Sequence, residues 1–285
     1  MLPNDVLLNI LDRLDTLDAI RTCVVSTRTQ YLPTMLSQIV IVLGAWELHR
    51  LNDRVVEVTD KILTTRSPQI PIRKLKLRFI MRGDDHLRIG RSVALAMASH
   101  KIDAAEFEVM TKRCFHHGDG PDPLYFAQQF NGFIRECPDA FAGLTRLYLQ
   151  NLRFDDVSDI PNILIACKQL ESLCFFRCDT KNLASVLRVE HARLLELDIN
   201  FGQLLTVELT CLPKLQRVRY NTWFYAVDPL VLLSVPQLSK MTLSCAYGVD
   251  ITLKLSEMLA NVHTIDNLEL DFQSQKVLSN DLCLL

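Results

Sequence analysis

Glycine is scarce in this sequence, with 9 residues among 285, which argues against a fold dominated by loops. Long apolar runs are missing too: the longest candidate, residues 39–43, has only the length of a strand, far below the roughly 18 residues of a membrane helix. Residues 1–5 carry no basic segment, and charged residues interrupt the next ten positions, so we expect no secretory signal. The expected location is the cytosol, the nucleus or both, with no membrane partner.

Excess charge is also missing. The formal net charge is -2, so the whole-molecule field gives no reason to expect nucleic acid as a partner. The 9 cysteines are odd in number and include no Cys-x-x-Cys pair. Most of them lie in apolar stretches, as Cys174 does, which is typical of reduced thiols and not of a disulfide framework.

Sequence motifs for catalysis are absent. There is no Gly-x-Ser-x-Gly, no His-Glu-x-x-His and no phosphate-binding glycine-rich loop. Residues 116–120 (His-His-Gly-Asp-Gly) hold possible metal ligands, but in a turn-like stretch without helical spacing. We therefore expect no catalytic residue, no metal and no cofactor. An enzyme would instead need a pocket that gathers histidine, aspartate and a nucleophile from distant segments.

The first residues predict a helix over 2–14 with a wide apolar face. The positions i, i+3, i+4 and i+7 are apolar, and two further residues widen the face; the six are Leu7, Ile10, Leu11, Leu14, Val6 and Leu8. A second helix is expected from Thr16 or Asp18 to Val25, with Thr16 as a possible cap. Its buried face would be Ala19, Ile20, Cys23 and Val24.

A third, shorter helix is expected from Ser26, ending near Leu32 because Pro33 disfavours helix at the residue before it. Three helices in about 40 residues form too small a core to be stable alone. The extra apolar surface of the first helix must then be covered, either by the rest of the chain, for which these helices would be an N-terminal cap, or by a partner.

The order of residues in this region resembles the F-box of plant F-box/leucine-rich-repeat proteins. The segments that carry the resemblance are Leu2-Pro3-Asn4-Asp5-Val6-Leu7-Leu8-Asn9-Ile10-Leu11, Arg13-Leu14, Asp18-Ala19-Ile20-Arg21-Thr22 and Val25-Ser26-Thr27-Arg28. The resemblance implies a substrate-recognition adaptor of an SCF-type ubiquitin ligase, in which the F-box binds a Skp-type adaptor, and through it a cullin. The residues implied to make or support the adaptor contacts are Leu2, Pro3, Val6, Leu7, Ile10, Leu11, Leu14, Ile20 and Val25.

Two positions depart from this family. Thr29 stands where a tryptophan is usual, and Pro33 stands where a second tryptophan is common. A lost aromatic anchor weakens an interface. The alternative function is therefore a repeat-type protein-binding scaffold with a vestigial F-box.

The remainder of the chain repeats one pattern: apolar, two variable, apolar, one variable, apolar. Most copies are spaced within the roughly 20–29 residues of a leucine-rich repeat. The eight copies are Ile72-Leu75-Leu77, Ile102-Ala105-Phe107, Leu144-Leu147-Leu149, Leu170-Leu173-Phe175, Leu194-Leu197-Ile199, Leu215-Val218-Tyr220, Leu238-Met241-Leu243 and Ile265-Leu268-Leu270. Each copy predicts a short strand that must stack on its neighbours to bury its apolar face.

The predicted organisation is of the α/β class: an F-box over 1–35, a linker with a cap strand and a helix over 36–70, and an irregular horseshoe solenoid of parallel strands over 71–285. Helices are expected over 50–63, with Leu51, Val55, Val58 and Ile62 on one face, and over 85–99 and 123–137. Only residues 272–285 remain to cover the last strand, and their leucines look like core, so we expect a truncated solenoid.

A ligand of the solenoid, an unknown protein substrate, would contact the residues between the buried positions. Arg217 and Arg219 face Glu196 and Asp198 on the next repeat, which favours lateral ion pairs over substrate binding. Tyr148 and Phe176 are better candidates, together with residues 223–225, which begin with Trp223. Burial against a neighbouring loop is the alternative for each.

Overall fold

The computed structural model describes residues 2–111, 122–155, 158–182, 186–202, 204, 206–223, 229–245 and 255–271. It is a mixed α/β structure in which the long strands run parallel. The chain forms two compact units, one of Met1–Gly120 with Gly132–Arg146 and the other of Pro121–Asn131 with Leu147–Leu285.

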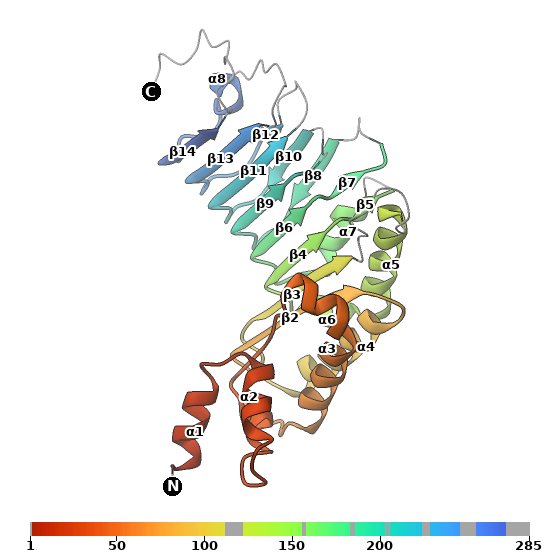
Figure 1. Cartoon of the computed structure of the whole chain (residues 1–285). Helices are drawn as coiled ribbons and strands as arrows, with labels where there is room; N and C mark the ends of the chain where they lie inside the picture. Colours follow the sequence, from red (N-terminus) through yellow and green to blue (C-terminus); the bar gives the residue numbers. More distant parts are fainter. Residues whose placement is uncertain are drawn as a thin grey trace. The chain divides into compact units, whose positions relative to one another are not determined.

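The first unit is built from helices that alternate with three parallel strands (Figure 1). Strands β1, β2 and β3 lie in that order, in a register that pairs Ile39 with Leu75 and Leu75 with Ala105. The elements are α1 (Asn4–Leu11), α2 (Thr16–Cys23), the 3-10 helix η1 (Leu32–Met35), β1 (Gln38–Ile41), α3 (Ala45–Thr65), β2 (Lys74–Met81), α4 (Asp85–Ser99), β3 (Ala105–Thr111) and α6 (Pro138–Ala142). Helix α5 (Pro123–Glu136) contributes residues to both units.

The second unit has a long parallel sheet in the order β4-β6-β9-β11-β13-β14, and a three-stranded sheet in the order β12-β10-β8. The long sheet consists of β4 (Arg146–Gln150), β6 (Ser172–Phe176), β9 (Glu196–Asn200), β11 (Arg217–Trp223), β13 (Lys240–Cys245) and β14 (Asn267–Asp271). The other elements are β5 (Arg153–Phe154), β7 (Asp179–Thr180), β8 (Val186–Glu190), β10 (Thr206–Cys211), β12 (Leu230–Leu232), α7 (Asp159–Ala166) and α8 (Leu255–Met258).

The repeated apolar pattern corresponds to strands at all eight predicted positions, and the predicted cap strand is β1. In the first seven copies, both later apolar positions are buried to 1% exposure or less, and so is every leading position except Ile102. Ile102 is only half-buried, as are the three apolar residues of the last copy, Ile265, Leu268 and Leu270. The pattern therefore predicts strands and core correctly, while the assignment of these units to leucine-rich repeats stays a prediction.

The segments that return between strands differ with the spacing of the copies. Long spacings hold helices: α4 and α5 lie where the sequence predicted them over 85–99 and 123–137, and α6 and α7 were not predicted. Short spacings hold strands β8, β10 and β12, which form their own sheet. An extended strand advances about 3.3 Å per residue and a helix about 1.5 Å, so a strand returns across the unit in fewer residues.

Two details of the second helix were predicted wrongly. The N-cap is Asp15, whose Oδ1 accepts a hydrogen bond from the backbone N–H of Asp18 at 2.9 Å. Thr16 is buried, and its Oγ1 instead accepts a hydrogen bond from the backbone N–H of Val40 at 2.7 Å. Val24 lies after the helix end and is 74% exposed. Helix α2 ends at Cys23, so Val24 does not continue its buried face as predicted.

The third helix was also predicted wrongly, because it begins at Leu32 instead of ending there. Pro33 lies in the first turn of η1, where a backbone N–H would have no hydrogen-bond partner within the helix. The lack of an N–H in proline therefore costs nothing at this position. In α3 the predicted face is rotated: Leu51 and Val58 are half-buried, while Asn52 is 1% exposed. The amide of Asn52 accepts from the N–H of Ile80 at 2.8 Å and donates to its carbonyl at 3.1 Å, which satisfies the end of β2.

The core of the first unit contains an aromatic cluster in which Gly90 is tightly enclosed. Phe133 stacks against Phe107 at a centroid distance of 6.3 Å and packs edge-on against Phe141 at 4.8 Å. A Cβ added at Gly90 would lie 2.3 Å from Cε2 of Phe133 and 2.8 Å from Sγ of Cys137. The absence of a side chain at Gly90 therefore allows α4 to approach this cluster.

The two strands β2 and β3 also carry an ion-pair ladder on one face. Lys76 Nζ lies 2.6 Å from Oε1 of Glu108, and Arg78 donates to Oε2 of the same carboxylate. Burial raises the pKa of Glu108, but the hydrogen bonds and charges of Lys76 and Arg78 outweigh it, so the pKa lies below its ordinary value. Because the folded-state pKa is depressed, the ionised carboxylate stabilises the fold above the unfolded-state pKa.

We predict that Gly90→Ala lowers the free energy of unfolding by about 1–3 kcal/mol, because the methyl group would overpack the aromatic cluster. Urea denaturation measures this. The matched control is Gly132→Ala in α5, where an added Cβ meets nothing within 4 Å. This control should keep stability or raise it by up to about 1 kcal/mol, since alanine favours helix. Equal losses in both variants would contradict the close packing at Gly90.

We further predict that Glu108→Gln lowers the free energy of unfolding by about 1–3 kcal/mol at pH 7, because two charged hydrogen bonds lose their acceptor charge. The difference from the parent chain should shrink as the pH falls below the ordinary glutamate value of 4.5. Denaturation curves across this pH range measure it. The control is Glu57→Gln, which removes an exposed pair with Arg54 at 2.9 Å and should cost only about 0.2–0.5 kcal/mol. A Glu108→Gln cost that stays constant to acid pH would refute the depressed pKa.

Candidate functional site

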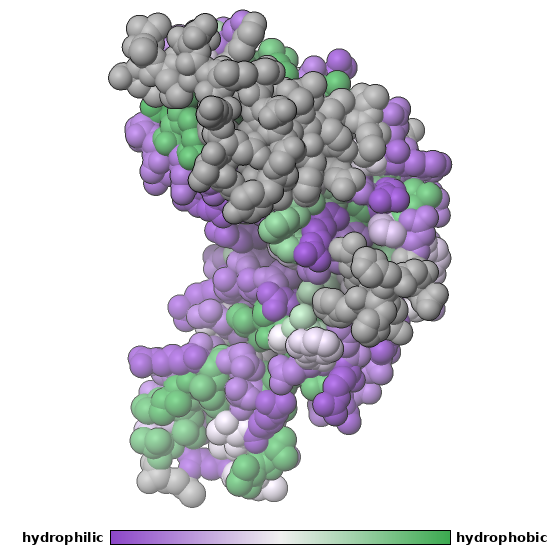
Figure 2. Space-filling view, turned by 45° about the horizontal axis from the view of Figure 1, so that its top comes forward, coloured by the Kyte–Doolittle hydropathy of each residue, from purple (hydrophilic) through white to green (hydrophobic). Residues whose placement is uncertain are grey.

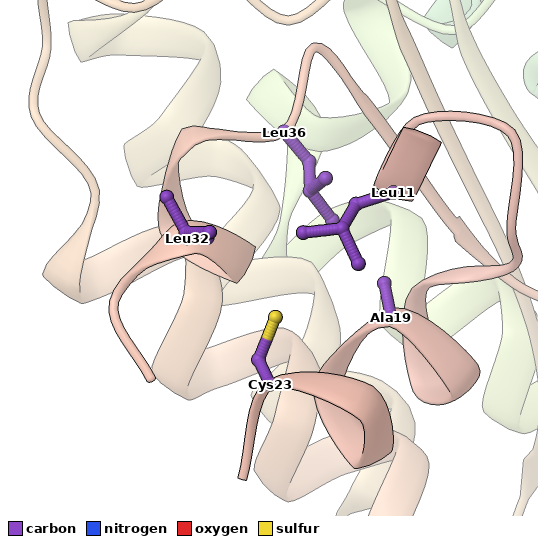
Figure 3. Close-up of a cluster of buried hydrophobic side chains, with 5 residues drawn as sticks. All are labelled: Leu11, Ala19, Cys23, Leu32 and Leu36. Atoms are coloured by element: carbon purple, nitrogen blue, oxygen red, sulfur yellow. The ribbon is translucent and has the colours of Figure 1, made fainter. Parts of the chain in front are cut away.

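The N-terminal helices form a small core of their own. Five buried side chains meet there, as Figure 3 shows: Leu11, Ala19, Cys23, Leu32 and Leu36. Leu7 and Leu8 are partly buried and pack against this cluster. The cluster draws on α1, α2, η1 and the residues just before β1, so these elements close on one another with a core smaller than an independent domain needs.

Hydrogen bonds attach these helices to the rest of the first unit. Asp12 accepts from the N–H of Ser37 at 2.9 Å and from its hydroxyl at 2.8 Å, just before β1. The buried guanidinium of Arg66, at the end of α3, donates to the carbonyls of Thr34, Ile70 and Pro71 at 3.2, 3.2 and 3.0 Å. With the bond from Val40 to Thr16, these contacts fix the helices to β1 and α3 without a flexible linker.

The segment after α2 folds back on the start of α1. The guanidinium of Arg28 donates to the carbonyl of Leu2 at 3.1 Å and to Oδ1 of Asn4 at 3.3 Å. Thr29, which stands where the plant family has a tryptophan, places its hydroxyl 2.9 Å from the carbonyl of Cys23. Thr29 therefore satisfies the end of α2 instead of presenting an aromatic ring.

Four apolar side chains in and beside α1 are exposed. Leu2, Val6, Ile10 and Leu14 follow one another at intervals of four residues and are 52%, 39%, 49% and 43% exposed. Val6 and Ile10 lie one turn apart on one face of α1, while Leu2 precedes the helix and Leu14 follows it. These four exposed side chains are named here the α1 ridge. Figure 2 shows hydrophobic residues gathered at the end of the molecule that carries α1 and α2. An apolar ridge of this kind marks an interaction surface.

The predicted adaptor-binding residues divide into three groups. Leu2, Val6, Ile10 and Leu14 form the α1 ridge, and Pro3 and Val25 are also exposed, Val25 by 87%. Leu7 and Ile20 are half-buried. Leu11 is buried in the cluster of Figure 3, so it supports the α1 ridge from inside and does not face a partner.

The second unit holds the predicted substrate-binding residues. The lateral ion pairs are present as predicted: Arg217 donates to Glu196 at 2.9 Å and Arg219 to Asp198 at 3.1 Å. Burial raises the pKa of Asp198, and the Arg219 charge only partly offsets it. These two arginines therefore complete a ladder inside the sheet, as expected of structural residues.

Tyr148 and Phe176 are half-buried, and their rings stack at a centroid distance of 6.2 Å. Sequence reasoning missed two neighbours. Phe201 packs edge-on against Phe176 at 5.5 Å, and the Arg177 guanidinium lies 5.4 Å from the Phe176 ring centre and 5.8 Å from that of Phe201. The only sequence signal was their place directly after a predicted strand. Trp223 ends β11, and its side chain, with residues 224–225, lies outside the described residues.

Two further sequence features belong with the site. The possible metal ligands of residues 116–120 lie outside the described residues, and no group of three or more His, Cys, Asp or Glu within the described part could hold a metal ion. Among the helices that the structure describes, none has the length and apolar character to cross a membrane. Burial raises the pKa of the Cys167 and Cys178 thiols to about 12, so both behave as core residues and not as nucleophiles.

Comparison with known proteins bears on the N-terminal helices. Residues 1–37 match the F-box domain. A comparison with curated proteins finds no match to this chain. F-box domains generally bind Skp-type adaptors in SCF complexes. The chain thus carries an F-box domain at its N-terminus. The presence of this domain supports a general role as an adaptor of SCF-type ubiquitin ligases.

Proposed function

We propose that this chain is the substrate-recognition subunit of an SCF-type ubiquitin ligase, acting in the cytosol or the nucleus. The observation that carries the proposal is the α1 ridge within the matched F-box: four apolar side chains, each at least 39% exposed, of which Val6 and Ile10 share one face of α1. These side chains are about half exposed, so covering them with a Skp-type adaptor would contribute about 1 kcal/mol for each.

The anchoring of the F-box supports the same function. A substrate receptor must hold its target at a fixed place relative to the cullin-bound enzyme, so its F-box must be attached firmly to the elements that follow it in the chain. Here Asp12, Thr16 and Arg66 bond the F-box helices directly to β1, α3 and the loop before β2. Residues 36–70, predicted as a linker with a cap strand and a helix, include β1 and α3 and form part of the first unit.

In this proposal the parallel strands form degenerate leucine-rich repeats that bind a target protein. The regular strand pattern and the partly exposed aromatic residues of the second unit support this assignment. The chain contributes no catalytic group, cofactor or metal of its own, and the chemistry of ubiquitin transfer belongs to the partner enzyme.

A second function is favoured by Thr29. Its hydroxyl bonds to the backbone of α2, so no aromatic side chain stands at this place to enter an adaptor. The alternative is a repeat-type scaffold with a vestigial F-box. A chain that folds fully but does not bind a Skp-type adaptor would have this function.

We predict that the intact chain co-precipitates with a purified Skp-type adaptor at micromolar concentration, and that Val6→Asp combined with Ile10→Asp reduces the affinity at least 100-fold. A carboxylate on the ridge would be desolvated without a partner on binding. The melting temperature of the double variant should stay close to that of the parent chain, because both side chains are exposed. Substitution of Leu11 would be a poor test, since Leu11 is buried and a charge there would unfold the F-box.

The control for this experiment is Leu95→Asp, which places the same charge at a 65% exposed leucine of α4. Leu95→Asp should bind the adaptor like the parent chain. No binding by the folded parent chain, or equal losses in the ridge and Leu95 variants, would overturn the proposed function.

A further inference from the structure

We propose that the second unit has a docking site for a protein segment that presents an aromatic or large aliphatic side chain beside a carboxylate. The site consists of Tyr148, Phe176, Arg177 and Phe201 and is named here the aromatic–arginine site. The inference deepens the proposed function, because it names the substrate class of the receptor. It rests on four observations: the packing of the rings, the position of the guanidinium, the backbone conformation and the charge of the surrounding sheet.

The three rings of the site contact one another in a row: Tyr148 lies in the middle of β4, Phe176 ends β6, and Phe201 follows the end of β9. Tyr148 stacks on Phe176 at 6.2 Å, and Phe176 packs against Phe201 at 5.5 Å. Phe201 is 45% exposed, and Phe176 is half-buried. Aromatic side chains are enriched among the residues that contribute most to binding at protein interfaces.

Arg177 lies against these rings and has its donors available. Its guanidinium is 5.4 Å from the centre of Phe176 and 5.8 Å from that of Phe201. No carboxylate among the described residues pairs with it. Two nearby acids already have other partners. Asp179, two residues after Arg177, accepts hydrogen bonds from Arg153 at 3.0 and 3.1 Å, and Asp198 on the neighbouring strand β9 pairs with Arg219. A guanidinium held by its faces keeps its in-plane N–H groups for a carboxylate.

The backbone at the site adopts a conformation that these residues rarely take. Arg177 has φ of 52° and Phe201 has φ of 55°, both in the left-handed region. Asn151 occupies the equivalent corner after β4 with φ of 54°, and asparagine tolerates this conformation. Each corner residue donates its N–H to the next strand: Asn151 to Phe176, Arg177 to Asn200 and Phe201 to Asn221. The corner geometry would suit asparagine or glycine at all three places, so an arginine and a phenylalanine there point to a binding role.

The charge of the surrounding sheet selects a peptide over a nucleic acid. The exposed face of the long sheet carries Arg217, Arg219 and Lys240, and it also carries Glu196, Asp198, Glu269 and Asp271. These acids would repel a phosphate backbone, which needs a row of uncompensated cations. Arg177 has no carboxylate partner in the described part of the chain and lies beside the aromatic rings. A peptide with one carboxylate next to an apolar side chain would therefore fit this site.

The test is selection of a displayed random-peptide library on the full-length chain, followed by affinity measurement of the enriched peptides as free synthetic peptides. The expected result is enrichment of an aromatic or large aliphatic residue within two positions of Asp or Glu. Arg177→Glu should reverse the charge preference, so that Lys or Arg replaces the acid. The control Lys168→Glu reverses an exposed cation after α7 and should leave the selection unchanged.

A second variant separates binding from folding. Phe201→Gly relieves the left-handed strain and removes the ring, so it should keep or raise the melting temperature while weakening the enriched peptides at least tenfold. Failure to enrich any peptide, enrichment without charge preference, or enrichment that Arg177→Glu leaves unchanged would overturn the site. So would a dT12 oligonucleotide that binds as tightly as the best peptide. Adaptor binding is measured in a separate experiment. A chain that does not bind the adaptor can therefore still confirm or refute peptide binding at the aromatic–arginine site.

Discussion

The in-register parallel pairing of strands is the constraint on which the rest of this structure depends. In such a sheet each position of a strand lies beside the same position of the next, as Leu173 does beside Leu197 and Leu197 beside Val218. Alternate apolar residues then form buried columns, and the residues between them form exposed columns. No single strand buries its own apolar face, so every strand depends on its neighbours for stability.

The same pairing explains the polar features of each unit. Placing Lys76 beside Glu106 and Arg78 beside Glu108 produces the ladder of the first unit, and placing Arg217 beside Glu196 produces that of the second. The recurring left-handed corner has the same origin, because every strand of β4, β6 and β9 ends at the same level and turns with the same geometry. The F-box joins this system through β1, which pairs with β2. Val40 of β1 and Ser37 just before it donate their backbone N–H groups to Thr16 and Asp12.

The sequence predicts those features that depend on periodicity. The apolar alternation located all eight strands, and the lateral pairs of Arg217 and Arg219 could be predicted by counting positions. Features set by single hydrogen bonds were missed. Asp15 and Thr16 are both plausible caps, and only the position of Val40 decides that Thr16 is used elsewhere. Asn52 took a core position because the end of β2 needs an amide, which no helical pattern shows.

The candidate sites show the same division. The wide apolar face of the first helix was visible in the sequence, but which of its residues are exposed depends on how α2 and η1 cover it, so Leu11 was grouped with the surface residues it supports. Arg177 and Phe201 could not be found at all, because a left-handed backbone is expected at glycine or asparagine and neither residue signals it. Their ring contacts arise only when three strands place their ends together.

Hydrogen–deuterium exchange of the full chain, with and without a purified Skp-type adaptor, tests the central claim most directly. The account predicts slower exchange over residues 2–14 and 24–31 when the adaptor is present, with unchanged exchange in β9, β11 and β13. Unchanged exchange over residues 2–14 at saturating adaptor, or protection confined to the long sheet, would contradict the claim that the α1 ridge is the adaptor-binding surface.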